Sequence, residues 1–211
     1  MTRNSMVPVA RQLLWVGALI LVPSCNRPER TAVSAPRAPS DSEKAALRTE
    51  IMAMAEEDQR LRFALMEHDP TDMKPLHELE KVDQKNTARM KQIVATFGWP
   101  SRSLVGAAAS HSAWLLVQHS AHDREFQRRC LQMMEPLVEK ADVDPQNYAY
   151  LFDRVRILDG KPQRYGTQFT TKDGVLQPSP IEDRDHLDER RKAVGLGPFE
   201  EYEKLMRSKR W

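Results

Sequence analysis

The chain has 211 residues, 40% of them hydrophobic, which is enough for one globular domain of ordinary size with a buried core. Its 32 basic and 30 acidic residues give a formal net charge of +2, and only Arg3 and Arg11 are charged before Cys25. Basic and acidic residues therefore balance after that leader. Because a balanced chain has no overall basic field, nucleic acid is excluded as an expected partner.

The N-terminal leader is the clearest signal in the chain. Arg3 and Arg11 precede the apolar run LLWVGALILV at 13–22, and a small residue and Cys25 follow it. This order is typical of a secretory signal, and the run is too short for a membrane span. The ending LVPSC resembles the lipobox of bacterial lipoproteins, so we expect residues 1–25 to be a lipoprotein-type signal peptide with Cys25 as its lipidation site. A plain signal peptide cut elsewhere and an uncleaved anchor are the alternatives.

The leader predicts a domain held at a lipid bilayer in the bacterial cell envelope, facing the periplasm or the exterior. Residues 26–41 are rich in proline, serine and alanine, which predicts a flexible tether. We expect residues 42–211 to form a single α-helical domain. Its one cysteine, Cys130, has no partner for an internal disulfide, so the core alone must hold the fold, and we interpret this thiol as structural rather than catalytic.

Five helices are predicted in the first part of the domain, from apolar residues that recur every three or four positions. The third is apolar nearly all round and should be the central, buried helix, whereas Pro136 should kink or divide the fourth. Glu56, Glu57 and Asp58 on the first helix are interpreted as a solvated face. The predicted helices are 41–66, 75–97, 101–119, 123–141 and 144–158.

After Gly160 the pattern changes to alternation, and QRYGTQFTTKDGVLQ at 163–177 predicts a hairpin with its turn at DG. Gly166 in the first strand suggests a bulge or a close backbone approach. Alternation would place one set of side chains, Gln163, Tyr165, Thr167 and Phe169, on one face and a second set, Arg164, Gly166 and Gln168, on the other. Two short helices separated by GLGP follow. The expected fold is mainly α, with five to seven helices and one small hairpin.

Several motifs in this order resemble a bacterial domain family of unknown function that occurs in exported and lipid-anchored proteins. They are GWP at 98–100, QH at 118–119, AYLFDR at 149–154, QRYGTQ at 163–168 and ERRKAVGL at 189–196. The resemblance covers roughly residues 58–202. Because the family has no settled activity, the resemblance implies motif positions but no role for any residue.

The polar residues at these positions form the candidate site. The candidates for catalysis are His119, Asp153, Tyr165 and Thr167. The wider set, expected to form a buried polar network or to bind a ligand, is Gln118, His119, Asp153, Arg154, Gln163, Tyr165, Gly166, Thr167 and Gln168. Arg190 and Arg191 also occupy motif positions.

Two interpretations of this set involve no catalysis. A satisfied polar network would dock the hairpin on the helices. Alternatively, Arg154 would pair with a carboxylate or phosphate of a small anionic ligand while Tyr165 and Gln168 orient it. An envelope protein is the other expected partner. Binding or scaffolding is favoured over catalysis.

The enzymatic alternative is an envelope hydrolase or transferase. His119 would be the general base, Asp153 would orient it, and Tyr165 or Thr167 would be the acid or nucleophile. The sequence contains no G-x-S-x-G, P-loop or H-E-x-x-H motif. His119 and His122 are three residues apart, but the helix should end near residue 120 and no glutamate ligand lies in the same run, so neither a metal nor a cofactor is expected.

Overall fold

A computed structural model describes residues 35–66 and 72–208. The expected signal peptide, Cys25 and most of the expected tether lie outside the described residues. The fold is mainly α with one two-stranded hairpin, as the sequence predicts. The described residues contain eight α-helices, one more than the upper end of the expected number. None of the helices in the described ranges is both long and apolar enough to cross a membrane.

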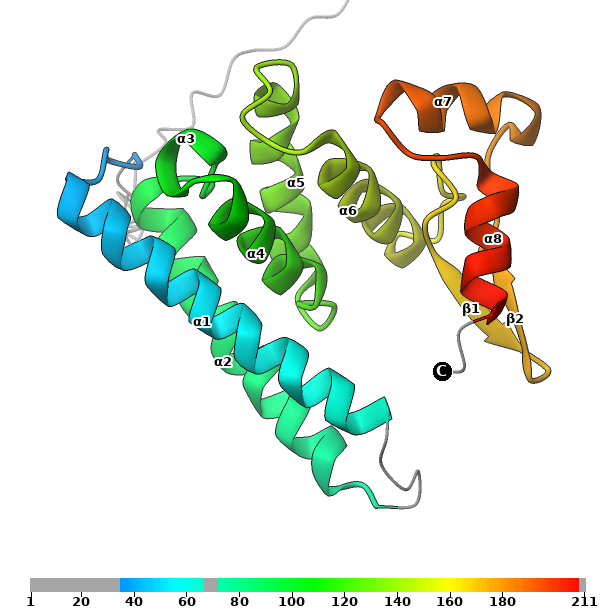
Figure 1. Cartoon of the computed structure of the whole chain (residues 1–211), viewed down its shortest axis with the longest axis horizontal. Helices are drawn as coiled ribbons and strands as arrows, with labels where there is room; N and C mark the ends of the chain where they lie inside the picture. Colours follow the sequence, from blue (N-terminus) through cyan, green and yellow to red (C-terminus); the bar gives the residue numbers. More distant parts are fainter. Residues whose placement is uncertain (1–34, 67–71, 209–211) are drawn as a thin grey trace, which may run out of the picture. The chain divides into compact units, whose positions relative to one another are not determined.

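Two long helices, α1 (Asp41–Met66) and α2 (Lys74–Phe97), run alongside each other in opposite directions (Figure 1). Helix α1 begins at Asp41 as predicted, and α2 ends where Gly98 takes φ +80° ahead of Pro100. Both helices pack against α4 (Ala107–Gln118), which contributes Ala109, Ala113, Leu116 and Val117 to the core. The expectation that this helix is central and buried is confirmed.

The expected continuous helix over 101–119 is wrong, because the chain breaks at Gly106 into α3 (Arg102–Val105) and α4. Gly106 has φ +84°, a conformation that glycine adopts without steric cost. The break frees the carbonyl of Val105 from the helical ladder. The Nε of Arg48 on α1 donates to this carbonyl at 2.9 Å. The hydrogen bond lost within the helix is therefore replaced by one from a neighbouring helix.

Helices α5 (Arg124–Val138) and α6 (Pro145–Leu158) pack against each other and against α4. Pro136 does not divide α5, which ends two residues after it. Helix α6 begins where the sequence predicts, and Asp144 caps it by accepting from the N–H of Gln146 at 2.9 Å. Cys130 of α5 is fully buried in the core, and burial raises the pKa of its thiol.

The hairpin consists of β1 (Phe169–Lys172) and β2 (Val175–Pro178), paired antiparallel with Lys172 opposite Val175. Asp173 and Gly174 both have positive φ, as a two-residue DG turn requires. Residues 163–168 are not a strand, so the expected alternation of their side chains between two faces is wrong. They form a loop whose one ladder contact is a bridge from Gln163 to Ile181.

The chain ends in a short 3-10 turn, η1 (Arg184–His186), and the helices α7 (Leu187–Ala193) and α8 (Phe199–Ser208) on either side of GLGP. The predicted close approach at Gly166 is confirmed. A Cβ at Gly166, where φ is +68°, would lie 2.8 Å from ring carbons of Phe199. The loop therefore packs against α8 at a distance that only glycine allows.

Candidate functional site

Asp153 of α6 holds the loop 163–168 in place through hydrogen bonds to its carboxylate. Its carboxylate is fully buried. Oδ1 accepts from the backbone N–H of Arg164 at 2.7 Å and of Tyr165 at 3.0 Å. Oδ2 accepts from the backbone N–H and the hydroxyl of Thr167, both at 3.0 Å. Burial raises the pKa of this carboxyl, and the bonds from the loop oppose the rise.

Gln163 fixes the other side of the same loop. This fully buried side chain donates from Nε2 to the carbonyl of Gln168 at 2.9 Å and to that of Ser179 at 2.8 Å. Its Oε1 accepts from the backbone N–H of Gln168 at 2.7 Å. The polar side chains of the loop thus bond to backbone groups, because the N–H and C=O groups of a loop packed inside the protein have few other partners.

Tyr165 and Thr167, two candidates for catalysis, are engaged in this packing. The Tyr165 ring lies edge-on to the Phe152 ring with centroids 5.7 Å apart. The backbone carbonyl of Tyr165 accepts from Arg191 at 2.7 Å. Arg191 is 2% exposed and also donates to the carbonyl of Gly197 at 2.7 Å. The Thr167 hydroxyl donates its proton in a hydrogen bond to Asp153. A nucleophilic hydroxyl would have to give this proton to a general base.

His119 does not pair with Asp153, so this part of the enzymatic interpretation is wrong. Its Nδ1 lies 2.8 Å from Oδ2 of Asp58, a fully buried carboxylate on α1. The Nε of Arg62 lies 3.0 Å from the same Nδ1 and also bonds Asp58. Because one nitrogen cannot donate to Asp58 and accept from Arg62 together, we assign the Nδ1 proton to the shorter contact with Asp58. No described residue bonds to Nε2.

Asp58 was missed as a site residue, since residues 56–58 were interpreted as a solvated face. A sequence signal exists: Asp58 lies seven positions after Ile51, which is in the core, and four after Met54, which packs against the core, so it falls on the buried stripe. Its pKa is raised by burial, but the bonds and charge of His119 and Arg62 outweigh burial and bring it to about 2. Arg62 also reaches Asp83 of α2 at 2.5 Å.

The low pKa of Asp58 predicts acid sensitivity. A carboxyl whose pKa falls from its ordinary 3.8 to about 2 on folding stabilises the protein above pH 4 and loses this contribution as the pH falls toward 2. We expect about 2 kcal/mol of unfolding free energy to disappear over that range in the wild type and not in Asp58→Asn. Urea unfolding at a series of pH values measures it, with exposed Glu56→Gln as the control. Equal slopes in wild type and Asp58→Asn would contradict the assignment.

Arg154 follows Asp153 on α6, but unlike Asp153 it lacks hydrogen-bond partners among the described residues. Its Nε is buried and has no hydrogen-bond partner, and its guanidinium makes no ion pair with a residue that the structure describes. Burial and the nearby positive charge of Arg62 lower the pKa of Arg154. Arg154 is half-buried and has no counter-ion among the described residues, which makes it a candidate for binding an anion.

Arg154 lines a cavity of about 500 Å³, here named the Arg154 hollow. Its charged lining residues are Arg154 and Lys161, and no acidic residue lines it. Gln168 adds an amide, while the apolar walls come from Ile157, Leu158, Pro162, Phe169 and Pro180. Of the three residues expected to hold an anion, Arg154 and Gln168 line this cavity and Tyr165 does not.

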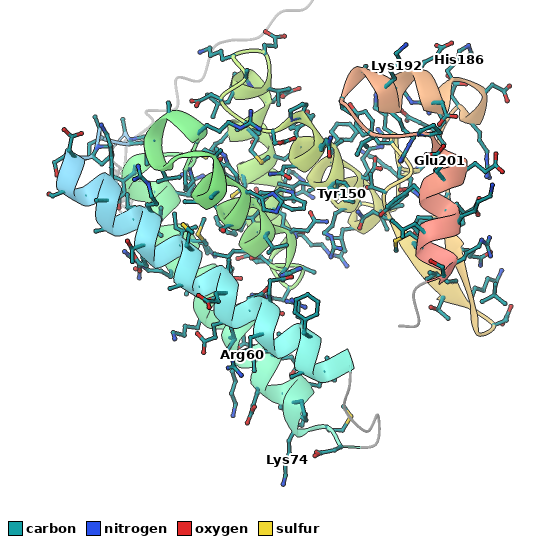
Figure 2. The ribbon with its side chains drawn as sticks, in the orientation of Figure 1. Arg60, Lys74, Tyr150, His186, Lys192 and Glu201 are labelled. Carbon is teal, nitrogen blue, oxygen red and sulfur yellow. The ribbon has the colours of Figure 1, made fainter. Side chains whose placement is uncertain are left out.

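Gln118 is the last residue of α4, and its side chain is buried. The ring of Trp114, one turn earlier on α4, packs edge-on against Tyr150, one turn before Arg154 on α6, with centroids 5.9 Å apart. Tyr150, labelled in Figure 2, also contacts the Tyr202 ring of α8 at 6.3 Å. The Oε1 of Gln118 is buried without a hydrogen-bond partner in the described part of the chain.

A family model described as a family of unknown function, DUF6624, matches residues 45–209. The chain belongs to the DUF6624 family. No curated protein matches the chain, and no solved structure matches it. The match extends beyond the predicted 58–202 at both ends, from the first turns of α1 to the end of α8. Both Asp58 and the Arg154 hollow lie inside the DUF6624 domain. Nowhere in its described residues do three or more histidine, cysteine or acidic side chains cluster as metal ligands would.

Proposed function

We propose that this chain is a lipid-anchored binding protein of the bacterial cell envelope, whose DUF6624 domain holds a small anion in the Arg154 hollow. The leader and the LVPSC sequence support the anchor. The single observation that carries the binding function is Arg154, whose Nε is buried without a partner beside a cavity with no acidic lining residue. A ligand carboxylate or phosphate would supply the missing counter-charge.

The lining also limits the class of ligand. Two cations at the polar side and five apolar residues at the walls fit an anion with an apolar body, and about 500 Å³ is within the range of small-molecule sites. Gln168 offers its amide for orientation. An inorganic anion would leave the apolar walls unused, and a neutral apolar compound would leave Arg154 unpaired.

Calorimetric titration of the full chain tests this function. The probes are octanoate, phenyl phosphate and octanamide, so that a carboxylate, a phosphate and a neutral compound of matched length are compared. We expect saturable binding of at least one anion and none of octanamide, with loss of at least about tenfold in affinity in Arg154→Met. Arg60→Met, an exposed residue of α1 labelled in Figure 2, is the matched control. Equal binding of octanamide, or equal loss in the control, would contradict the proposal.

The second candidate function is an envelope hydrolase or transferase, and the Asp58–His119 pair favours it. A buried carboxylate that holds Nδ1 leaves Nε2 as a base, and His119 is 17% exposed. Since Thr167 is bonded to Asp153, water is the better nucleophile in this scheme. A binding protein returns its ligand unchanged, whereas this alternative requires a product that disappears in His119→Gln.

The lipid anchor is tested separately. Cells that express the full chain are grown with labelled palmitate. We expect label on the wild type and none on Cys25→Ala, because the thiol of the lipobox cysteine is the acceptor of the lipid. Cys130→Ala is the matched control and should keep the label, since that thiol is buried in the folded domain. Unlabelled wild type, or label that survives in Cys25→Ala, would exclude this anchor.

A further inference from the structure

The facing sides of α1 and α2 form a second cavity, the α1–α2 groove, of about 540 Å³. Its lining includes Met54 and Glu57 from α1 and Lys85, Asn86 and Arg89 from α2. None of these residues lines the Arg154 hollow. The groove is therefore a site independent of the proposed function.

Asn86 is the residue that marks the groove as more than a packing gap. It is 2% exposed, and its Nδ2 is buried with no hydrogen-bond partner in the part of the chain that the structure describes. No described residue donates to its Oδ1 either. An amide that is buried and unbonded lowers stability, and it presents a donor and an acceptor side by side. The group that satisfies both atoms at once is another amide.

Charged side chains also line the groove, and they would orient a bound molecule that carries charges of its own. Glu50 and Arg89 neutralise each other through two hydrogen bonds, 2.6 and 2.9 Å long. Glu57 and Lys85, from opposite helices, make no ion pair with any described residue. The groove thus offers a free carboxylate, a free ammonium and a buried amide. These three groups complement an ammonium, a carboxylate and a peptide bond.

We infer that the α1–α2 groove binds a short peptide with free ends, of which a dipeptide is the smallest. Asn86 bonds the C=O and N–H of the peptide group, Glu57 takes the terminal ammonium and Lys85 the terminal carboxylate. The side chains of the peptide lie along Met54 and the alanines that line the groove. A cavity of about 540 Å³ accommodates a ligand of this size.

Titration of the full chain with L-alanyl-L-alanine tests the inference. We expect saturable binding that weakens about two- to fivefold for the N-acetylated and the C-amidated dipeptides, because each lacks one exposed ion pair. The depsipeptide analogue, which has an ester in place of the peptide bond, should lose about tenfold, because Oδ1 of Asn86 then has no donor. Absence of binding to the dipeptide, or equal affinity for all four compounds, would overturn the inference.

Variants separate recognition from folding. Asn86→Leu should abolish dipeptide binding while the melting temperature stays equal or rises, since an unbonded buried amide is replaced by an apolar group. Glu57→Gln and Lys85→Gln should each weaken binding about two- to fivefold. The neighbouring exposed residues Glu56 and Lys81, changed to Gln, are matched controls and should bind normally. Unchanged dipeptide binding by Asn86→Leu would overturn the site, whatever the outcome at the Arg154 hollow.

Discussion

Asp153→Ala is expected to lower the free energy of unfolding by about 3–5 kcal/mol, because it leaves the buried loop donors without an acceptor. The carboxylate accepts from three backbone N–H groups and one hydroxyl of the loop. Because Asp153 is fully buried, water does not replace it as the acceptor for these donors. Urea unfolding followed by circular dichroism gives the value.

The neighbouring carboxylate Asp159 provides the matched control. It lies at the end of α6 and bonds exposed Arg128 at 2.6 Å. Asp159→Ala should cost less than about 1 kcal/mol, as for other exposed ion pairs. Asp153→Asn should lie between the two, because its amide keeps one acceptor but turns an N–H toward the loop donors. A loss below about 1 kcal/mol in Asp153→Ala would show that the loop does not depend on this carboxylate.

Arg154→Met is expected to raise the free energy of unfolding by about 1–3 kcal/mol while anion binding is lost. The cause is the removal of a half-buried positive charge whose Nε is buried without a partner and which lies near the charge of Arg62. Methionine has a similar length and no charge, so the apolar contacts of the stem are kept. Thermal or urea unfolding without ligand measures the gain.

Arg191→Met is the comparison, because Arg191 is also an arginine without an ion pair to a described residue, and it is more deeply buried than Arg154. It differs in donating to the carbonyls of Tyr165 and Gly197 and in lying 5.1 Å from the Tyr202 ring centroid. Its loss leaves two carbonyls unpaired and should lower stability by about 2–4 kcal/mol. If both variants were destabilised alike, Arg154 would be a structural residue and the hollow would lose its main support.

The elements that the sequence predicts well are those that local signals determine. Asp144 followed by Pro145 begins α6, and DG at 173–174 makes the hairpin turn. Such caps and turns depend on neighbours a few residues away, so their chemistry is visible in the sequence. The break at Gly106 was missed because its compensating bond comes from Arg48, on another helix.

The candidate site was harder to predict because its pairs are distant in sequence. Asp58 and His119 are 61 residues apart, so no local pattern joins them. The alternating pattern of 163–168 predicts a strand, but Gly166 takes a positive φ and Asp153 draws three backbone N–H groups toward one carboxylate. The predicted set does not stay together, because His119 pairs with Asp58 of α1 and Tyr165 does not line the Arg154 hollow. The division of the set into a loop anchor around Asp153 and an unpaired cation at Arg154 required the structure.

The adjacency of Asp153 and Arg154 has a consequence for motion. One wall of the Arg154 hollow belongs to α6, whereas the opposite wall, Gln168 to Thr170, continues from the loop that Asp153 holds. Rupture of the bonds to one carboxylate would release that wall together with the hairpin, as a single cooperative unit. We therefore expect any ligand of the hollow to exchange with solvent no faster than residues 164–167 open. If the hollow binds an anion as proposed, we expect the bound anion to slow hydrogen exchange at those amides.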